Sequence, residues 1–261
     1  MRLKTYIINL EKSTVRRQYM QDLLSKFEFL DLEFIKAIDG RSLSDEALHS
    51  RFDFKRSRAL YGKTMNAGEI GCVLSHRKVY QELLDSEDPY ALVLEDDISV
   101  VRDLNLLDLE AVDKIANSDR PRILLLSGDY SYFKRRTPVV RVYAANGAYA
   151  YIINREAAKR ILSVSAPSNL ADDWKFYKRK GVKLLAVYPY MIDANTNMEL
   201  LGSDVKQDIW SIDRSKMAVS EVIIQACTSF IERMFRVFNH YEYKIRIYNN
   251  EIVERLKNPF R

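Results

Sequence analysis

The sequence predicts an α/β protein with a mostly parallel central sheet. Short aliphatic and β-branched runs alternate with stretches of helical periodicity over the first 200 residues, a pattern typical of parallel strands covered by helices. The 261 residues are enough for one large α/β domain, and a composition of 47% hydrophobic and 30% charged residues excludes wholesale disorder. Apolar runs stay well short of the ~20 residues that cross a bilayer.

Strands and helices are predicted in alternation from composition and periodicity. Asn66 and Glu69 have the spacing of a capping box at the start of a helix. The predicted strands are Thr5–Leu10, Leu32–Ala37, Tyr90–Leu94, Arg122–Leu126, Val139–Ala144, Tyr149–Ile153 and Val182–Val187. The predicted helices are Ser13–Phe27, Asn66–Leu84, Asp108–Asn117, Glu156–Leu162 and Asp173–Lys180.

The last part of the chain has a different pattern. Apolar residues recur at helical spacing from Val219 to Phe238, and the chain then becomes basic and aromatic. We therefore predict a main domain of residues 1–205 and a helical, basic-aromatic appendix of residues 206–261. A broad apolar stripe followed by cations is typical of a helix in a membrane interface, but it equally fits a helix packed on the domain or a dimer interface. All three interpretations stay open.

Charge and cysteine content set the broad class of partner and compartment. The net charge of +5 indicates a mild preference for anionic partners without naming one. The two cysteines, Cys72 and Cys227, exclude a disulfide framework and a cysteine-based zinc site, and they favour a reducing cytoplasm. The basic run at residues 51–58 is predicted to be a solvated loop, a lid over an anionic ligand or a contact to acidic lipid. No nucleic-acid-binding motif occurs, so we expect no nucleic-acid partner.

Three consecutive carboxylates carry the strongest chemical signal. Glu95, Asp96 and Asp97 directly follow the apolar strand Tyr90–Leu94. Adjacent carboxylates repel one another, and a buried strand end is unfavourable for them unless a cation lies there. Mg²⁺ and Mn²⁺ bind one or two carboxylates together with phosphate oxygens, and open α/β sheets bind ligands at the carboxyl ends of their strands. A solvated acidic turn explains these residues alone equally well.

In its motifs and their order the chain resembles glycosyltransferase family 25. The resemblance covers roughly residues 3–205, and family membership implies a GT-A-like nucleotide-sugar-binding fold, a UDP-sugar donor and inversion at the anomeric carbon. The family contains bacterial lipopolysaccharide and lipooligosaccharide galactosyltransferases and collagen galactosyltransferases. The motifs that carry the resemblance are Gly68-Glu69-Ile70-Gly71-Cys72-Val73-Leu74-Ser75-His76, Leu92-Val93-Leu94-Glu95-Asp96-Asp97-Ile98 and Asn9-Leu10 with Arg16.

The resemblance also implies roles for individual residues. Asp97 would bind Mn²⁺ or Mg²⁺, which bridges the donor diphosphate, and Glu95 would help to hold the metal or the donor ribose. Arginine suits phosphate because its planar guanidinium donates two parallel hydrogen bonds, and Arg17 is the alternative to Arg16 in this role. The implied donor-binding residues are Asn9, Arg16, Arg17, Glu95 and Asp96.

Inverting transfer needs a base that takes the proton of the attacking hydroxyl. Asp172 is the first candidate and Asp173 the second, because the family has an acidic residue here with an aromatic residue two positions on. That aromatic residue, Trp174, is predicted to contact the acceptor sugar. Either aspartate also fits a simple helix cap. His76 is predicted to be a hydrogen-bonded structural residue, and Asp193 is an alternative oxygen ligand.

These observations predict a metal-dependent inverting glycosyltransferase. It would transfer a sugar from a UDP-sugar to a bacterial lipopolysaccharide or lipooligosaccharide acceptor, and galactose is the favoured sugar. The reaction would take place in the cytoplasm or at the periphery of the inner membrane. UDP-glucose and UDP-GlcNAc stay open as donors because no motif reads the C4 epimer. The alternative from another class is a non-catalytic basic module that binds membrane or nucleic acid, but such a module has no need for three carboxylates at a strand end.

Overall fold

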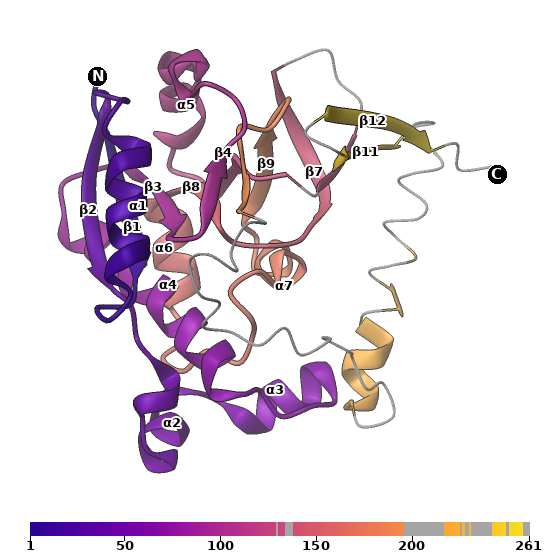
Figure 1. The fold of residues 1–261 in the computed structure, drawn as a ribbon. Helices are drawn as coiled ribbons and strands as arrows, with labels where there is room; N and C mark the ends of the chain where they lie inside the picture. Colours follow the sequence, from indigo (N-terminus) through magenta and orange to yellow (C-terminus); the bar gives the residue numbers. More distant parts are fainter. Residues whose placement is uncertain are drawn as a thin grey trace.

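The fold is an α/β sandwich built on one large sheet (Figure 1). The computed structural model describes residues 1–128, 130–133, 138–195, 217–224, 226–227, 230, 242–248 and 251–257. The strands are β1 (Leu3–Asn9), β2 (Leu30–Lys36), β3 (Tyr90–Glu95), β4 (Ile98–Val100), β5 (Arg122–Leu125), β6 (Tyr130–Phe133), β7 (Val139–Ala145), β8 (Ala150–Asn154), β9 (Lys183–Val187), β10 (Ile192–Ala194), β11 (Glu242–Tyr248) and β12 (Glu251–Lys257). The α-helices are α1 (Thr14–Leu24), α2 (Asp45–Arg51), α3 (Phe54–Tyr61), α4 (Ala67–Asp85), α5 (Leu109–Ala116), α6 (Arg155–Leu162) and α7 (Trp174–Arg179), and two 3₁₀ turns are η1 (Gly40–Ser42) and η2 (Leu104–Leu106).

The large sheet has the strand order β12-β11-β6-β7-β9-β5-β8-β3-β1-β2, and β4 pairs with β10 in a small second sheet. β1 is parallel to β2 and β3, and β5 is parallel to β9. β8 lies between β3 and β5 and is antiparallel to both, so β1, β2, β3, β5 and β9 all run in one direction. The predicted α/β class and the common strand direction of the sheet centre are confirmed. The sequence did not predict the reversed direction of β8, because an apolar run does not encode the direction of its strand.

Two hydrophobic clusters cover the two faces of the sheet. Alternate strand residues belong to different clusters: Val93 packs with the cluster that includes α4, α6 and α7, whereas Leu92 and Leu94 pack with the one that includes α1 and α5. This alternation follows from the two-residue period of a strand. The predicted capping box is also confirmed, since Asn66 accepts from the backbone of Glu69 and Glu69 accepts from that of Asn66.

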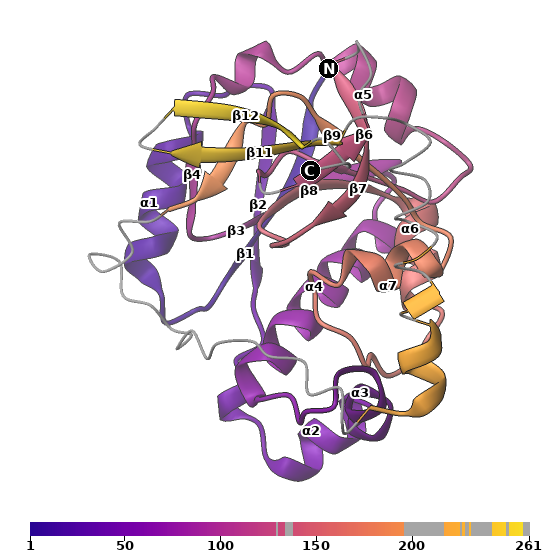
Figure 2. The same cartoon turned by 90° about the vertical axis from the view of Figure 1, so that its right-hand side faces the viewer.

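The basic run at residues 51–58 is not a loop, which corrects the sequence prediction. It spans the end of α2 and most of α3, and both helices lie away from the sheet (Figure 2). Ser44 and Asp53 begin these helices by accepting hydrogen bonds from the backbone of Ala47 and Arg56. Gly62 ends α3 with a φ of 70°, a conformation that glycine adopts without strain.

The C-terminal segment is only partly helical. Residues 219–224 are helical, but β11 pairs with β6 and β12 pairs with β11, so residues 242–257 extend the main sheet. The prediction of a helical appendix over residues 206–261 is therefore wrong for these two strands. In β11, charged and apolar residues alternate with period two over residues 242–247. The predicted division between residues 205 and 206 lies outside the described residues. Among the helices described, none is long and apolar enough to cross a membrane.

Asn154 joins three parts of the fold. Its Oδ1 accepts from the backbone of Arg122 on β5 and from that of Ala157 in the first turn of α6. Its Nδ2 donates to the carbonyls of residues 116, 118 and 120, at the end of α5 and just after it. The side chain is 1% exposed, so water cannot replace these bonds.

We expect Asn154→Ala to lower the free energy of unfolding by about 2–4 kcal/mol, because it removes a helix cap and leaves buried backbone groups unpaired. Urea denaturation measures this loss. Asn117→Ala, at an exposed asparagine, is the matched control and should change stability by less than about 0.5 kcal/mol. Equal stabilities for the two variants would contradict the role of Asn154.

Candidate functional site

Asp96 is the buried member of the carboxylate cluster Glu95-Asp96-Asp97. β1 runs beside β3, with Ile8 opposite Glu95, so Asn9 at the end of β1 lies next to the cluster. Asn9 Nδ2 donates to Asp96 Oδ2 at 2.7 Å, and Arg16 Nη1 of α1 donates to Asp96 Oδ1 at 2.8 Å. Burial still raises the pKa of Asp96, against the lowering effect of both partners. Asn9 and Arg16 thus hold a carboxylate, whereas the sequence predicted that they bind a donor.

Asp97 is a largely buried carboxylate with little counter-charge. Its Oδ2 lies 3.6 Å from Arg16 Nη1, a cation that Asp96 already engages. Burial, together with the negative charges of Glu95 and Asp96, raises the pKa of Asp97 to about 7. A divalent cation with oxygen ligands would remove this repulsion, and Asp97 and Glu95 offer carboxylate oxygens for it. The residues therefore fit the metal that the sequence predicts.

Glu95 ends a buried hydrogen-bond chain. His76 Nε2 lies 3.1 Å from Glu95 Oε1, His76 Nδ1 lies 2.7 Å from the Tyr151 hydroxyl, and that hydroxyl lies 2.7 Å from the Tyr80 hydroxyl. Burial raises the pKa of both tyrosines, so they stay protonated and can donate. An imidazole that donates from Nε2 to Glu95 can accept at Nδ1 from the Tyr151 hydroxyl, which in turn can accept from the Tyr80 hydroxyl. His76 is thus a hydrogen-bonded structural residue, as predicted, and it orients Glu95.

Cys72 lies on the same face of α4 as His76, four residues earlier. Its side chain is exposed, not a core residue as its apolar context suggests. The ligand atoms of Cys72, His76 and Glu95 lie within 4.8 Å of one another. The sequence analysis missed this group, although the spacing of four residues on a predicted helix was a signal for it.

Asp172 and Asp173 have different environments. Asp173 Oδ1 accepts from the backbone of Phe176 as the N-cap of α7, and its Oδ2 accepts from the Tyr61 hydroxyl at 2.5 Å. Asp172 accepts only a backbone hydrogen bond, from Gly147 at 3.1 Å, among the bonds of the described residues. Burial and the charges of Glu95 and Asp173 raise the pKa of Asp172. The cap belongs to Asp173, and Asp172 lies close enough to Glu95 to be affected by its charge. Nothing in the sequence around Tyr61 predicted its hydrogen bond to Asp173.

Two other predicted residues have different surroundings from those expected. Trp174 is 1% exposed, packs against Tyr151 and Tyr177 and donates from its indole to the Gly147 carbonyl, so no ring face is open to an acceptor sugar. Arg17 is directed to Phe34, with its guanidinium 4.1 Å from the ring centre. It therefore does not replace Arg16, because one step along a helix turns a side chain by about 100°.

Asp193 lies beside the cluster on β10. β10 pairs with β4, which follows Asp97, and this pairing brings Asp193 opposite Ser99. Its Oδ1 accepts from the Tyr149 hydroxyl at 3.1 Å, and the Tyr149 carbonyl accepts from the backbone of Glu95. Asp193 is thus near the carboxylates but already holds a tyrosine.

Comparisons with known proteins agree with the resemblance in the motifs. Residues 2–126 match the sequence model of "Glycosyltransferase family 25 (LPS biosynthesis protein)". A "Glycosyltransferase 25 family member" of Aedes aegypti is 38% identical over 36% of this chain, but the match covers only 16% of that protein's length. An Acanthamoeba polyphaga mimivirus protein named as a glycosyltransferase is 28% identical over 83% of this chain and 70% of its own length.

Two further matches extend the comparison. Human "Procollagen galactosyltransferase 2" is 25% identical over 61% of this chain and 27% of its own length. The crystal structure of a glycosyltransferase involved in the glycosylation of the major capsid of PBCV-1 has a TM-score of 0.39 and 9% identity, and the superposition covers 74% of this chain and 92% of that one.

We expect Asp97→Asn to stabilise the metal-free protein at pH 8. An unfolded Asp97 titrates near 3.8 and the folded one near 7, so the folded state binds more protons between these values. The contribution of Asp97 to stability is therefore complete below about pH 4 and is lost as the pH rises through 7. Asparagine cannot ionise, so the gain at pH 8 should be on the order of 1 kcal/mol, since one pKa unit corresponds to about 1.4 kcal/mol and solvent screens part of the charge.

Thermal melts in EDTA from pH 4 to 8 measure this difference. Asp119→Asn, at an exposed aspartate, is the matched control and should follow the unmodified protein. A difference between Asp97→Asn and the unmodified protein that does not change with pH would contradict the assignment.

Proposed function

We propose that the chain, whose residues 2–126 match the sequence model of glycosyltransferase family 25, is a metal-dependent inverting glycosyltransferase. It transfers a sugar from a UDP-sugar to a bacterial lipopolysaccharide or lipooligosaccharide acceptor, and galactose is the favoured sugar. The observation that carries this proposal is the carboxylate cluster at the carboxyl ends of β1 and β3, in which Asp97 is left without a full counter-charge. A solvated acidic turn does not explain an arginine and an asparagine that fix the middle carboxylate from two other elements.

In this proposal Asp97 and Glu95 hold Mn²⁺ or Mg²⁺. When bound, the metal supplies Lewis-acid stabilisation of the charge that develops on the departing UDP. The chain fixes the geometry: Asn9 and Arg16 hold Asp96, and His76 holds Glu95. Ligands that are already oriented by neighbouring hydrogen bonds lose less entropy on binding a metal.

Asp172 is the proposed general base. Its raised pKa makes it a stronger base than an ordinary aspartate, and the pKa of an efficient base lies near the working pH. Asp173 is occupied by its cap and by Tyr61, which supports Asp172 over its neighbour. With Asp172 beside the carboxylate cluster, the acceptor hydroxyl would approach from the side of α7.

The choice of galactose as the sugar and of a glycolipid as the acceptor is based on the names of the matched relatives and family. One matched relative is named a procollagen galactosyltransferase, and the family description refers to LPS biosynthesis. UDP-glucose and UDP-GlcNAc remain alternative donors, because no described contact reads the C4 hydroxyl.

Contact with the anionic inner membrane is part of the same proposal. Val219, Ile223 and Phe230 in the C-terminal helical segment are 75%, 56% and 64% exposed, so they are available to an interface. Met234, Phe235 and Phe238, which continue the predicted apolar stripe, lie outside the described residues. Removing everything after Val205 would also remove β11 and β12 from the sheet, so a truncation is a poor test of membrane contact.

The activity test uses the full chain with Mn²⁺ and, in turn, UDP-galactose, UDP-glucose and UDP-GlcNAc. We expect UDP release that depends on a lipooligosaccharide acceptor, that stops in EDTA and that returns when Mn²⁺ is restored. Asp97→Ala should abolish it, because the metal loses a ligand, while Asp119→Ala should not change it. Full turnover in EDTA would contradict metal dependence, and no release from any donor would contradict the proposal as a whole.

A second prediction separates the two aspartates. Asp172→Asn should lower turnover by at least ~100-fold with little change in donor affinity, since it removes a general base. Asp173→Asn should retain most turnover and stability, because asparagine still accepts at the N-cap. Steady-state kinetics with the donor found above measure both. A larger loss in Asp173→Asn would move the base to that residue, and normal turnover in both would exclude the segment from the chemistry.

A further inference from the structure

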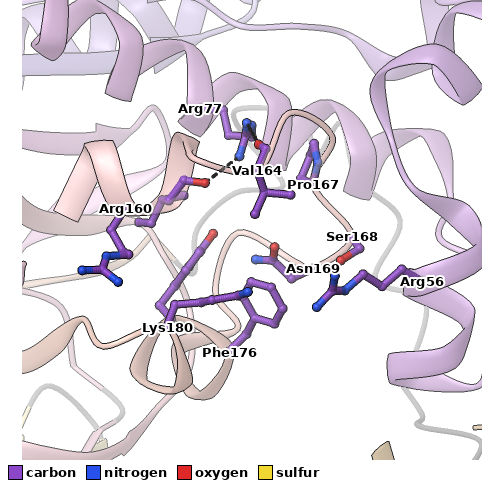
Figure 3. Close-up of a pocket in the computed structure, with 11 residues that line it drawn as sticks. Arg56, Arg77, Arg160, Val164, Pro167, Ser168, Asn169, Phe176 and Lys180 are labelled. Carbon is purple, nitrogen blue, oxygen red and sulfur yellow. Dashed lines mark hydrogen bonds between the residues drawn. The ribbon is translucent and has the colours of Figure 1, made fainter. Parts of the chain in front are cut away.

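A second pocket, of opposite charge to the carboxylate cluster, lies among α3, α6, α7 and the segment that joins α6 to α7 (Figure 3). The side chains that decide its chemistry are Arg56, Arg77, Arg160, Asn169, Phe176 and Lys180. No carboxylate is among its lining residues, although aspartate and glutamate are common elsewhere on the surface.

One of the four cations is used by the fold. Arg77 donates to the carbonyls of Ile161 at 3.0 Å and Val164 at 2.5 Å, and it thereby closes the C-terminal end of α6. Arg56, Arg160 and Lys180 make no ion pair within the part of the chain that the structure describes. These three charges are therefore available to a ligand.

The arrangement of these cations suits a small anion. Arg56 and Lys180 reach toward one another from opposite sides, with Asn169 and Phe176 between them, and Arg160 lies at the rim (Figure 3). Lys180 Nζ lies 5.6 Å from the centre of the Phe176 ring, which limits the water around it. Like charges that face a common space repel each other, and an anion between them turns this repulsion into attraction.

The donors also define the chemical class of the anion. Arginine and lysine side chains have only N–H donors, so the occupant must supply several acceptors. A phosphate group has three or four oxygens on a compact centre, and it matches the planar guanidinium in two parallel bonds. The pocket is separate from the carboxylate cluster, because none of Glu95, Asp96 and Asp97 is among its lining residues.

We propose that this pocket binds a phosphate group. The group belongs either to free phosphate and small phosphate esters or to the headgroup of an anionic lipid. The two sources share the same recognition chemistry and differ in whether the phosphate is presented by a membrane. The site does not depend on the proposed sugar transfer, and its test needs no enzyme activity.

The test titrates the ¹⁵N-labelled full chain with inorganic phosphate and follows backbone amide signals. We expect saturable shifts at Asn169 and Phe176. In the double variant Arg56→Ala/Lys180→Ala the dissociation constant should rise at least about tenfold, because each charge-assisted hydrogen bond contributes about a factor of ten. Lys55→Ala/Arg58→Ala is the matched control: both residues are exposed on α3 and the change in charge is the same, so its dissociation constant should change less than about twofold.

A second arm identifies the source of the phosphate. Sedimentation with vesicles of phosphatidylglycerol and phosphatidylcholine, compared with pure phosphatidylcholine, reports headgroup binding. If Arg56→Ala/Lys180→Ala loses both phosphate and vesicle binding while the control keeps both, the lipid headgroup is the ligand; if only phosphate binding is lost, the ligand is soluble.

A melting curve in phosphate-free buffer checks that each variant is folded, and Arg56→Gln/Lys180→Gln replaces the alanine pair if that pair is not. No saturable shift at the pocket, or an equal loss in the pocket variant and the control, would overturn the proposal, because phosphate would then respond only to overall charge.

Discussion

The pairing of Asp96 with Asn9 and Arg16 is the contact on which the candidate site depends. It joins the end of β1, the first turns of α1 and the end of β3 through two side-chain hydrogen bonds to one buried carboxylate. A buried carboxylate without such partners would be strongly unfavourable, so these three elements must meet for the strand to end here. Asp96 forms the closest ion pair with Arg16. The negative charges of Asp97 and Glu95 therefore repel each other with little compensation.

The hydrogen-bond chain from α4 provides the second constraint. His76, Tyr151 and Tyr80 link the centre of α4 to β8 and to Glu95, and each of these three side chains is buried. Tyr151 on β8 lies opposite Val93 on β3, on the face of the sheet that α4 covers, and this register places its hydroxyl within reach of α4. Buried networks of this kind fix one arrangement of their members, because any other leaves a polar group unpaired.

The molecule also separates its charges around α7. The helix begins at Asp173, near the carboxylates, and ends near Lys180, in the basic pocket. The mild net charge of +5 hides this separation, because it sums an acidic site and a basic one. Net charge therefore says little about what either surface binds.

The sequence by itself determined the elements and the chemical nature of the site. Periodicity located the strands from β1 to β9 that the analysis named, the capping box of α4 and the carboxylates at the end of β3, because these depend on neighbours within a few positions. Only the tertiary structure decided which aspartate caps α7, that Trp174 is closed to a ligand, that Arg17 faces Phe34, and that β11 and β12 join the sheet. Each of these depends on residues that are far apart in the chain, such as Tyr61 and Asp173, and no local pattern records which distant groups will meet.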